Sequence, residues 1–100
     1  DKELIASDIG LDIESFNELF NDYNKEVNEL SENIIQSADN NDITICKGLA
    51  IKLKGMSENM RIHKLDAELN EIINTTNTDK IKESVESIIF KLAQISNLED

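Results

Sequence analysis

The chain has 100 residues, of which 21 are acidic and 10 are basic, and its net charge is −11. Such a charge disfavours nucleic acid and anionic membranes as partners, because both are polyanions. A single cysteine excludes a disulfide framework and fits a reducing compartment, and no apolar run approaches the roughly 20 residues that span a bilayer. Residue 1 is Asp rather than Met, so we expect one domain over residues 1–100, cut from a longer protein.

Apolar residues recur every three or four positions along most of the chain, which is the spacing of one face of an α-helix. A short lead-in helix is expected over Lys2–Ser7, before Gly10. The first long stripe predicts a helix of roughly seven turns with Asp12 as its N-cap. Its members are Ile13, Phe16, Phe20, Tyr23, Val27, Leu30 and Ile34.

Polar residues separate the next two stripes from the first. Residues 39–41 form a turn signal, and Asp42 can cap the helix that follows. The second stripe contains Cys46, Leu49, Leu53, Met56 and Met60. A third stripe is out of phase with the second, which predicts a break near Arg61. Its members are Ile62, Leu65, Leu69 and Ile72.

The last stripe completes an all-α pattern. Residues 74–78 are all Asn and Thr and are expected to form a loop. Four main amphipathic helices with short connections predict an antiparallel up-down four-helix bundle with a short N-terminal lead-in helix. In that fold the stripes form the core and need no further function. The last stripe consists of Ile81, Val85, Ile88, Leu92 and Ile95.

The helix expected between Asp42 and Met60 has an unusual outer face. Ile51 falls about 180° from the centre of the apolar stripe, and Gly48 and Gly55 lie about one turn to either side of it. A glycine inside a helix costs roughly 1 kcal/mol relative to alanine, and it leaves bare backbone that another surface can approach closely. The alternatives are a helix packed on both sides, or glycines tolerated on a free surface.

Positive charge gathers in the same part of the chain. Residues 43–64 carry five basic side chains and one acidic, a net +4, whereas the other 78 residues carry five basic and 20 acidic, a net −15. Lys47 and Lys54 border the glycine strip on the helical wheel. The pattern predicts an acidic body with one basic helix, suited to docking an acidic partner. Its alternative is an ordinary solvated face.

A short motif on this helix resembles a known family. The residues are Leu49-Ala50-Ile51-Lys52-Leu53-Lys54-Gly55 and then Ser57-Glu58-Asn59-Met60. They resemble the A-H-x-L-K-G signature and the following turn of histidine-phosphotransfer (HPt) domains of bacterial phosphorelays. The resemblance covers nearly the whole chain, because the expected helix boundaries also fall where the family has them.

The resemblance implies a docking role without phosphoryl transfer. In the family, the histidine of the motif accepts a phosphoryl group from an aspartyl phosphate on a receiver domain. Ile51 stands at that position, and isoleucine offers no nucleophile. Lys54 matches the lysine that helps to neutralise the phosphate, and Gly55 matches the glycine that makes room for the receiver. Arg61 departs from the glycine that is usual at the turn.

No other residue is expected to carry chemistry. His63, the only histidine, is interpreted as a surface residue without function, and Cys46 as a buried and inert thiol. No metal site, cofactor site or carboxylate pair for acid–base work is predicted, so the chain is not expected to be an enzyme.

The sequence therefore predicts a non-catalytic HPt-like signalling module that docks a response-regulator receiver domain or a histidine kinase module. We expect a cytoplasmic location, free or within a membrane-anchored sensor kinase, no membrane insertion, and a monomer as an isolated domain. The alternatives are a phosphotransfer domain whose acceptor histidine has been substituted at position 51, and a plain structural helical bundle. The expected contact residues are Lys47, Gly48, Ile51, Lys52, Lys54, Gly55 and Glu58.

Overall fold

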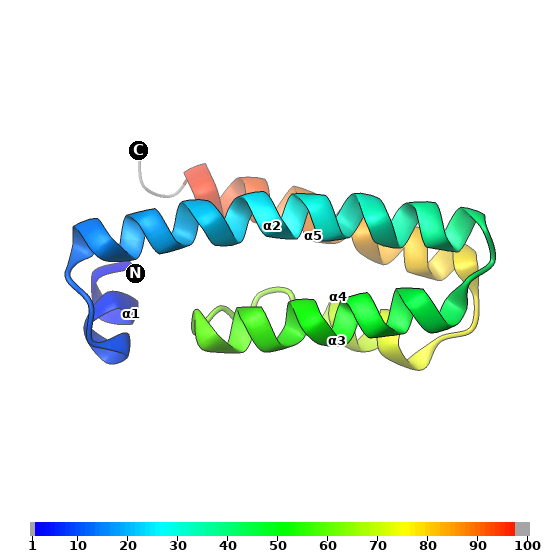
Figure 1. Cartoon of the computed structure of the whole chain (residues 1–100), viewed down its shortest axis with the longest axis horizontal. Helices are drawn as coiled ribbons and strands as arrows, with labels where there is room; N and C mark the ends of the chain where they lie inside the picture. The colour runs from blue at the N-terminus through cyan, green and yellow to red at the C-terminus, as the bar shows by residue number, and fades with distance from the viewer. Residues whose placement is uncertain (1, 98–100) are drawn as a thin grey trace.

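The computed structural model describes residues 2–97, and this part of the chain forms five helices and no strand (Figure 1). It measures 42 × 22 × 19 Å along its principal axes. The predicted all-α class is confirmed. None of the helices in residues 2–97 is both long enough and apolar enough to cross a membrane. The helices are α1 (Lys2–Ile9), α2 (Ile13–Asp39), α3 (Ile43–Asn59), α4 (Asp66–Asn74) and α5 (Thr78–Asn97).

Aspartate side chains cap the first amides of α2 and α3, as the sequence predicts. Asp12 Oδ1 accepts a hydrogen bond from the Ser15 amide at 2.7 Å, and Asp42 Oδ1 accepts one from the Ile45 amide at 3.2 Å. Each bond satisfies an amide that the helix itself leaves without a partner. The hydrogen bond from the Ser15 amide also lowers the pKa of Asp12.

Three helices end in the same backbone turn. Gly10, Asn41 and Arg61 have φ angles of 88°, 60° and 57°, and each stands just after the end of a helix. In each turn the next amide donates to the carbonyl five residues earlier, at 2.8 to 2.9 Å, as Ile62 does to Ser57. This is the Schellman arrangement, in which glycine is the residue best suited to the left-handed position. Arg61 occupies such a position, so the backbone there is the one that a glycine would adopt.

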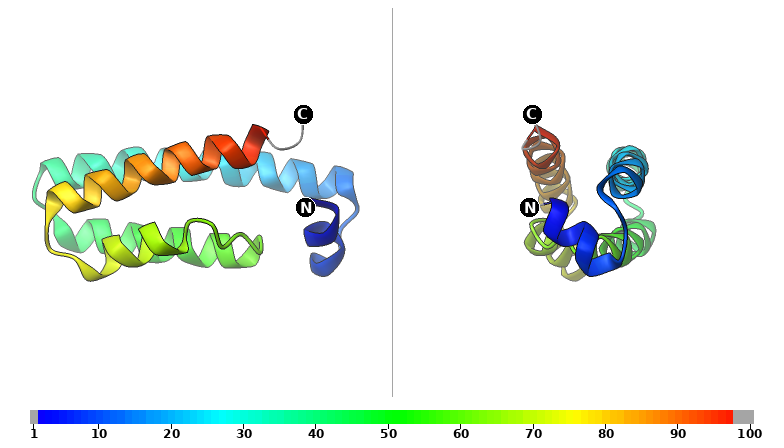
Figure 2. Two further views of the ribbon diagram at one scale, coloured as in Figure 1. Left: turned by 180° about the vertical axis from the view of Figure 1, so that it is seen from behind. Right: turned by 90° about the vertical axis from the view of Figure 1, so that its left-hand side faces the viewer.

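The helices surround one hydrophobic core. Helix α2 packs against α3 and α5, helix α4 also packs against α3 and α5, and α1 packs against α2. The end-on view in Figure 2 shows α1 lying across one end of the other helices. An ion pair between Lys82 and Asp39 joins the start of α5 to the end of α2. Most of the predicted stripes are buried, with Leu49, Met56 and Ile95 half-buried at the edge of the core.

The prediction is wrong for one core residue. Ile13, the first member of the α2 stripe, is 41 % exposed. The reason is a mismatch in length: α2 has 27 residues and α3 has 17, which correspond to about 40 Å and 25 Å. The first turns of α2 extend past the end of α3, so α3 cannot cover them.

The predicted break near Arg61 is confirmed, but several boundaries differ. The connection between α3 and α4 runs to Leu65, so Ile62 is buried within a non-helical segment rather than on a helix. The lead-in helix continues to Ile9 instead of ending at Ser7. The predicted loop over residues 74–78 shortens to 75–77, because its first residue ends α4 and its last begins α5.

Helix α4 is held at its start by α5 rather than by a cap of its own. Its N-cap residue makes no side-chain capping hydrogen bond. Lys91 Nζ of α5 instead donates to the Lys64 carbonyl at 3.2 Å and lies 2.7 Å from Glu68 Oε2. The Ser87 hydroxyl also donates to Glu68 at 2.7 Å. Burial alone would raise the pKa of Glu68, but these hydrogen bonds outweigh it and the pKa is lowered.

Candidate functional site

Helix α3 buries one face against the core and leaves the opposite face open. Its buried residues are Cys46, Ala50, Leu53 and Ser57. Measured around the helix axis, the centre of this buried face lies about 50° from the centre of the stripe that the large apolar residues predict. Ala50 and Ser57 account for the rotation, because both are fully buried although neither belongs to the stripe of large apolar residues.

Ile51 is exposed on α3, as predicted, with 57 % of its surface accessible. Because the buried face is rotated, Ile51 lies about 130° from its centre, on the shoulder that faces α4, rather than directly opposite the core. A Cβ atom added at Gly48 or at Gly55 would have no neighbouring atom within 4 Å. Both glycines therefore leave bare, unobstructed backbone beside an exposed isoleucine. We call Gly48, Ile51 and Gly55 the bare face of α3.

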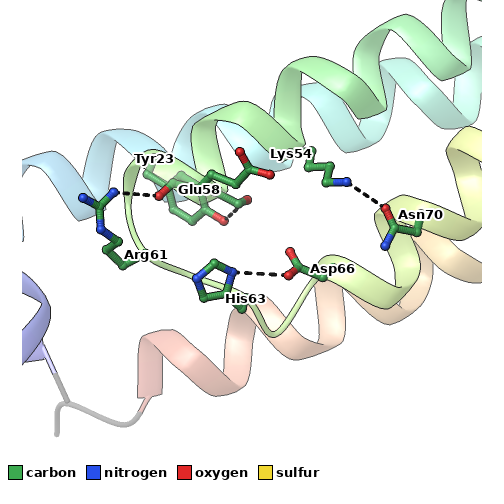
Figure 3. A network of polar contacts seen from close by, with 8 residues as sticks. Tyr23, Lys54, Glu58, Arg61, His63, Asp66 and Asn70 are labelled. Carbon is green, nitrogen blue, oxygen red and sulfur yellow. Dashed lines mark hydrogen bonds and ion pairs between the residues drawn. The ribbon is translucent and has the colours of Figure 1, made fainter.

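The charged residues of the expected contact surface divide between the two shoulders of α3. Lys54 reaches α4, where its Nζ donates to Asn70 Oδ1 at 3.1 Å (Figure 3). Lys52 lies on the opposite shoulder, with its Nζ 3.7 Å from Glu26 of α2. Neither lysine is held in a buried ion pair, so both charges remain near the surface.

Lys47 and Glu58 complete the set of predicted contact residues. Lys47 is half-buried and Glu58 is exposed. On the helical wheel both fall on the same shoulder as Ile51 and Lys54. The structure thus places Lys47, Lys54 and Glu58 on the shoulder of α3 nearest Ile51 and leaves Lys52 on the other shoulder.

The predicted basic helix is less basic than the sequence segment that defines it. Arg61 and Lys64 follow the end of α3 and belong to the connection with α4. Arg61 Nε pairs with Asp8 of α1 at 3.0 Å, and its Nη1 donates to the Glu58 carbonyl at 3.2 Å. Helix α3 itself carries three lysines and one glutamate, a net +2 rather than +4.

His63 and Cys46 lie apart from the bare face. His63 is on the α3–α4 connection, and its Nδ1 lies 3.2 Å from Asp66 Oδ2 (Figure 3). Cys46 is buried, and its thiol donates to the Ile34 carbonyl at 3.4 Å. Burial, reinforced by the negative charge of Asp42, raises the pKa of Cys46. A raised pKa keeps the thiol protonated and unreactive at neutral pH.

A polar contact beneath α3 is not predictable from the sequence. The Tyr23 hydroxyl of α2 and the Ser57 hydroxyl of α3 are buried and lie 2.7 Å apart (Figure 3). Burial raises the pKa of Tyr23 despite this hydrogen bond, and the negative charge of Asp66 raises it further. Tyr23 was assigned only to the core stripe, and no spacing rule relates it to a serine 34 positions away.

Residues 2–97 contain no group of three or more His, Cys, Asp or Glu side chains arranged to hold a metal ion. No family model matches the chain, no curated protein matches its sequence, and no solved structure matches its fold. The resemblance to HPt domains thus rests on the motif residues and on the helix boundaries of the sequence.

Proposed function

We propose that this chain is an HPt-like signalling domain that docks a response-regulator receiver domain and does not itself carry phosphate. Its helices would form an antiparallel up-down four-helix bundle with α1 as the lead-in. The observation that carries the proposal is the bare face of α3, where an isoleucine that is 57 % exposed stands between two glycines with open space above them.

The energetics of α3 support a docking role for the bare face. Two glycines within a helix cost roughly 1 kcal/mol each relative to alanine. Nothing inside the described part of the chain requires them, because a Cβ at either position would meet no atom within 4 Å. A partner that packs closely on the backbone would require them, and the exposed Ile51 side chain supplies apolar area at the centre of such a contact.

Charge supports an acidic partner for the same surface. Lys47 and Lys54 stand with Glu58 on one shoulder of the bare face and Lys52 stands on the other, so that α3 has a net charge of +2 on a chain of net charge −11. Receiver domains carry an acidic active site, so this face would favour the approach of that site while the rest of the surface repels it.

The side chain at position 51 determines what the docked complex can do. Phosphoryl transfer needs an acceptor lone pair in line with the phosphorus atom, and isoleucine has none. Docking without transfer would sequester a receiver or would block a competent HPt domain from reaching it.

Titration of the purified domain with a panel of response-regulator receiver domains, followed by NMR, tests the proposal. We expect at least one receiver to bind, with amide shifts centred on Gly48, Ile51 and Gly55. The variant Gly55→Leu should abolish binding while keeping the helical fold, because its side chain would project into open space. Ile45→Glu is the matched control, because Ile45 is also exposed on α3, at 49 %, but lies on the other shoulder. Failure of every receiver to bind would favour the plain structural bundle.

Phosphorylated receivers separate docking from transfer. The wild-type chain should acquire no acid-labile phosphate at any residue, His63 included. Ile51→His should restore phosphoryl acceptance if the surrounding surface retains the geometry of a competent acceptor site. Phosphate on the wild-type chain would contradict a non-catalytic role.

A further inference from the structure

Arg61 occupies a backbone position to which its residue type is poorly suited. Its φ angle is 57°, and a residue with a side chain adopts this left-handed conformation only at a cost in free energy. The two other helices that end in the same turn have Gly10 and Asn41 there, the residue types that tolerate the conformation best. Such a conformation persists where contacts of the same residue offset its cost, so the side chain of Arg61 is expected to make them.

The Arg61 side chain joins α1 to the end of α3. Its Nε donates to Asp8 Oδ2 of α1 at 3.0 Å, and its Nη1 donates to the Glu58 carbonyl of α3 at 3.2 Å (Figure 3). Asp8 lies in the last turn of α1, where a negative charge opposes the helix dipole. Both members of the ion pair thus stand at positions that are locally unfavourable for them. We call Asp8, Arg61 and the Glu58 carbonyl the α1 clamp.

Apolar packing attaches α1 only weakly to the rest of the domain. The helix has eight residues, fewer than an isolated helix needs to be stable in water. Ala6 is its one buried residue, and the small alanine side chain removes little apolar area from water. Ile5 and Ile9 are only partly buried, and Leu4 is 70 % exposed. Polar contacts therefore carry a large share of the attachment of α1.

We propose that α1 is a lid that opens and closes as one unit about Gly10, and that Arg61 holds it closed. Gly10 has a φ angle of 88° and carries no side chain that would hinder rotation of the backbone between α1 and α2. Opening removes Lys2 Nζ from its place 4.0 Å from the centroid of the Phe20 ring, and it exposes that apolar ring to solvent. The lid lies at one end of the molecule (Figure 2), and the proposal is independent of receiver docking.

Thiol labelling of an Ala6→Cys variant tests the proposal. Position 6 is 2 % exposed, so a thiol there reacts with N-ethylmaleimide only when α1 opens. Cys46 is fully buried in α3 and is an internal reference for unfolding of the whole domain. Both rates are read by peptide mass spectrometry and divided by those of the urea-unfolded protein. We expect the thiol at position 6 to react at least about tenfold faster than Cys46.

Arg61→Gly, made in the Ala6→Cys background, should change the two rates in opposite directions. Loss of the ion pair should speed labelling at position 6 by about threefold. Relief of the left-handed backbone stabilises the folded domain whether α1 is open or closed, so labelling of Cys46 should slow by about twofold. Asn41→Gly is the matched control, because it changes the same turn at the other end of α3 and should leave the rate at position 6 unchanged.

Asp8→Asn removes the other half of the α1 clamp. It should also speed labelling at position 6 by about threefold. In the Arg61→Gly background the same substitution should add nothing, because the ion pair is already absent.

Three results would overturn the proposal. Equal labelling rates at position 6 and at Cys46 would show that α1 opens only when the whole domain unfolds. An unchanged rate at position 6 in Arg61→Gly would show that Arg61 does not hold α1. Additive effects of Arg61→Gly and Asp8→Asn would show that the two side chains act separately rather than as one clamp.

Discussion

The hydrogen bond between Tyr23 and Ser57 should contribute measurably to stability. It joins α2 to α3 two residues beyond Gly55, and both side chains are buried, at 4 % and 0 % exposed. Tyr23→Phe removes one partner and leaves the Ser57 hydroxyl buried without its hydrogen bond, which costs about 1–3 kcal/mol. For a domain of this size, a loss of 2 kcal/mol lowers Tm by roughly 8–16 °C.

A double-mutant cycle, measured by urea unfolding with far-UV circular dichroism, isolates this hydrogen bond. Ser57→Ala alone should also destabilise, because it leaves the Tyr23 hydroxyl without its partner. The double variant Tyr23→Phe with Ser57→Ala should be more stable than the sum of the single losses predicts, by about 1 kcal/mol or more. Removing both polar groups together leaves neither of them buried and unpaired.

Ser31→Ala is the matched control for the cycle. Ser31 is also a fully buried helical serine, but its hydroxyl has no hydrogen-bond partner in the described part of the chain. Its replacement should be neutral or stabilising, whereas Ser57→Ala should destabilise. Additive losses for Tyr23 and Ser57, or equal losses for the two serines, would refute the reasoning.

Three further predictions concern helix propensity and pH. Gly55→Ala should raise the free energy of unfolding, measured by urea titration, by about 1 kcal/mol, because a Cβ atom at this position meets no other atom within 4 Å. A loss of stability would show that the position is not open. Glu68 has a lowered folded-state pKa, so its contribution is present above its unfolded pKa and is lost as pH falls through the folded value. Unfolding measured at neutral and acidic pH should therefore show a smaller acid-induced loss for Glu68→Gln than for wild type, and equal losses would exclude this contribution. Tyr23 is the only tyrosine and there is no tryptophan, so ultraviolet absorbance of tyrosinate reports it alone. Because its folded pKa is raised, it should ionise above about pH 10, with stability falling as pH rises through that value; ionisation at the ordinary pH would contradict its burial.

Helix faces were predictable from the sequence because burial imposes a spacing of three and four residues on apolar side chains. The stripe from Phe16 to Ile34 is buried without exception, and both aspartate caps are confirmed. The spacing within one helix says nothing about the length of its neighbour, however. For that reason the sequence pattern predicts Ile13 in the core, although α3 ends too early to cover it.

The candidate site was predictable in part. Exposure of Ile51 followed from the helical period, and the open space at Gly48 and Gly55 agrees with that prediction. The exact orientation of α3 does not follow from the sequence, because the stripe of large apolar residues leaves out Ala50 and Ser57, which are fully buried. The partners of Lys52 and Lys54 could not be predicted either, because they depend on which helices become neighbours in space.

Because the helices differ in length, the free energy of local opening should vary along the long axis of the molecule. Toward the turn at Asn41, α2 is packed between α3 and α5, so its amide protons should exchange slowly. Near Ile13, α2 has α1 instead of α3 as a neighbour, and we expect its first turns to open locally at a lower free energy. Hydrogen exchange should therefore slow steadily from one end of α2 to the other. We therefore expect fluctuation to be concentrated at the end of the molecule that carries α1, while the middle of α3 keeps its shape.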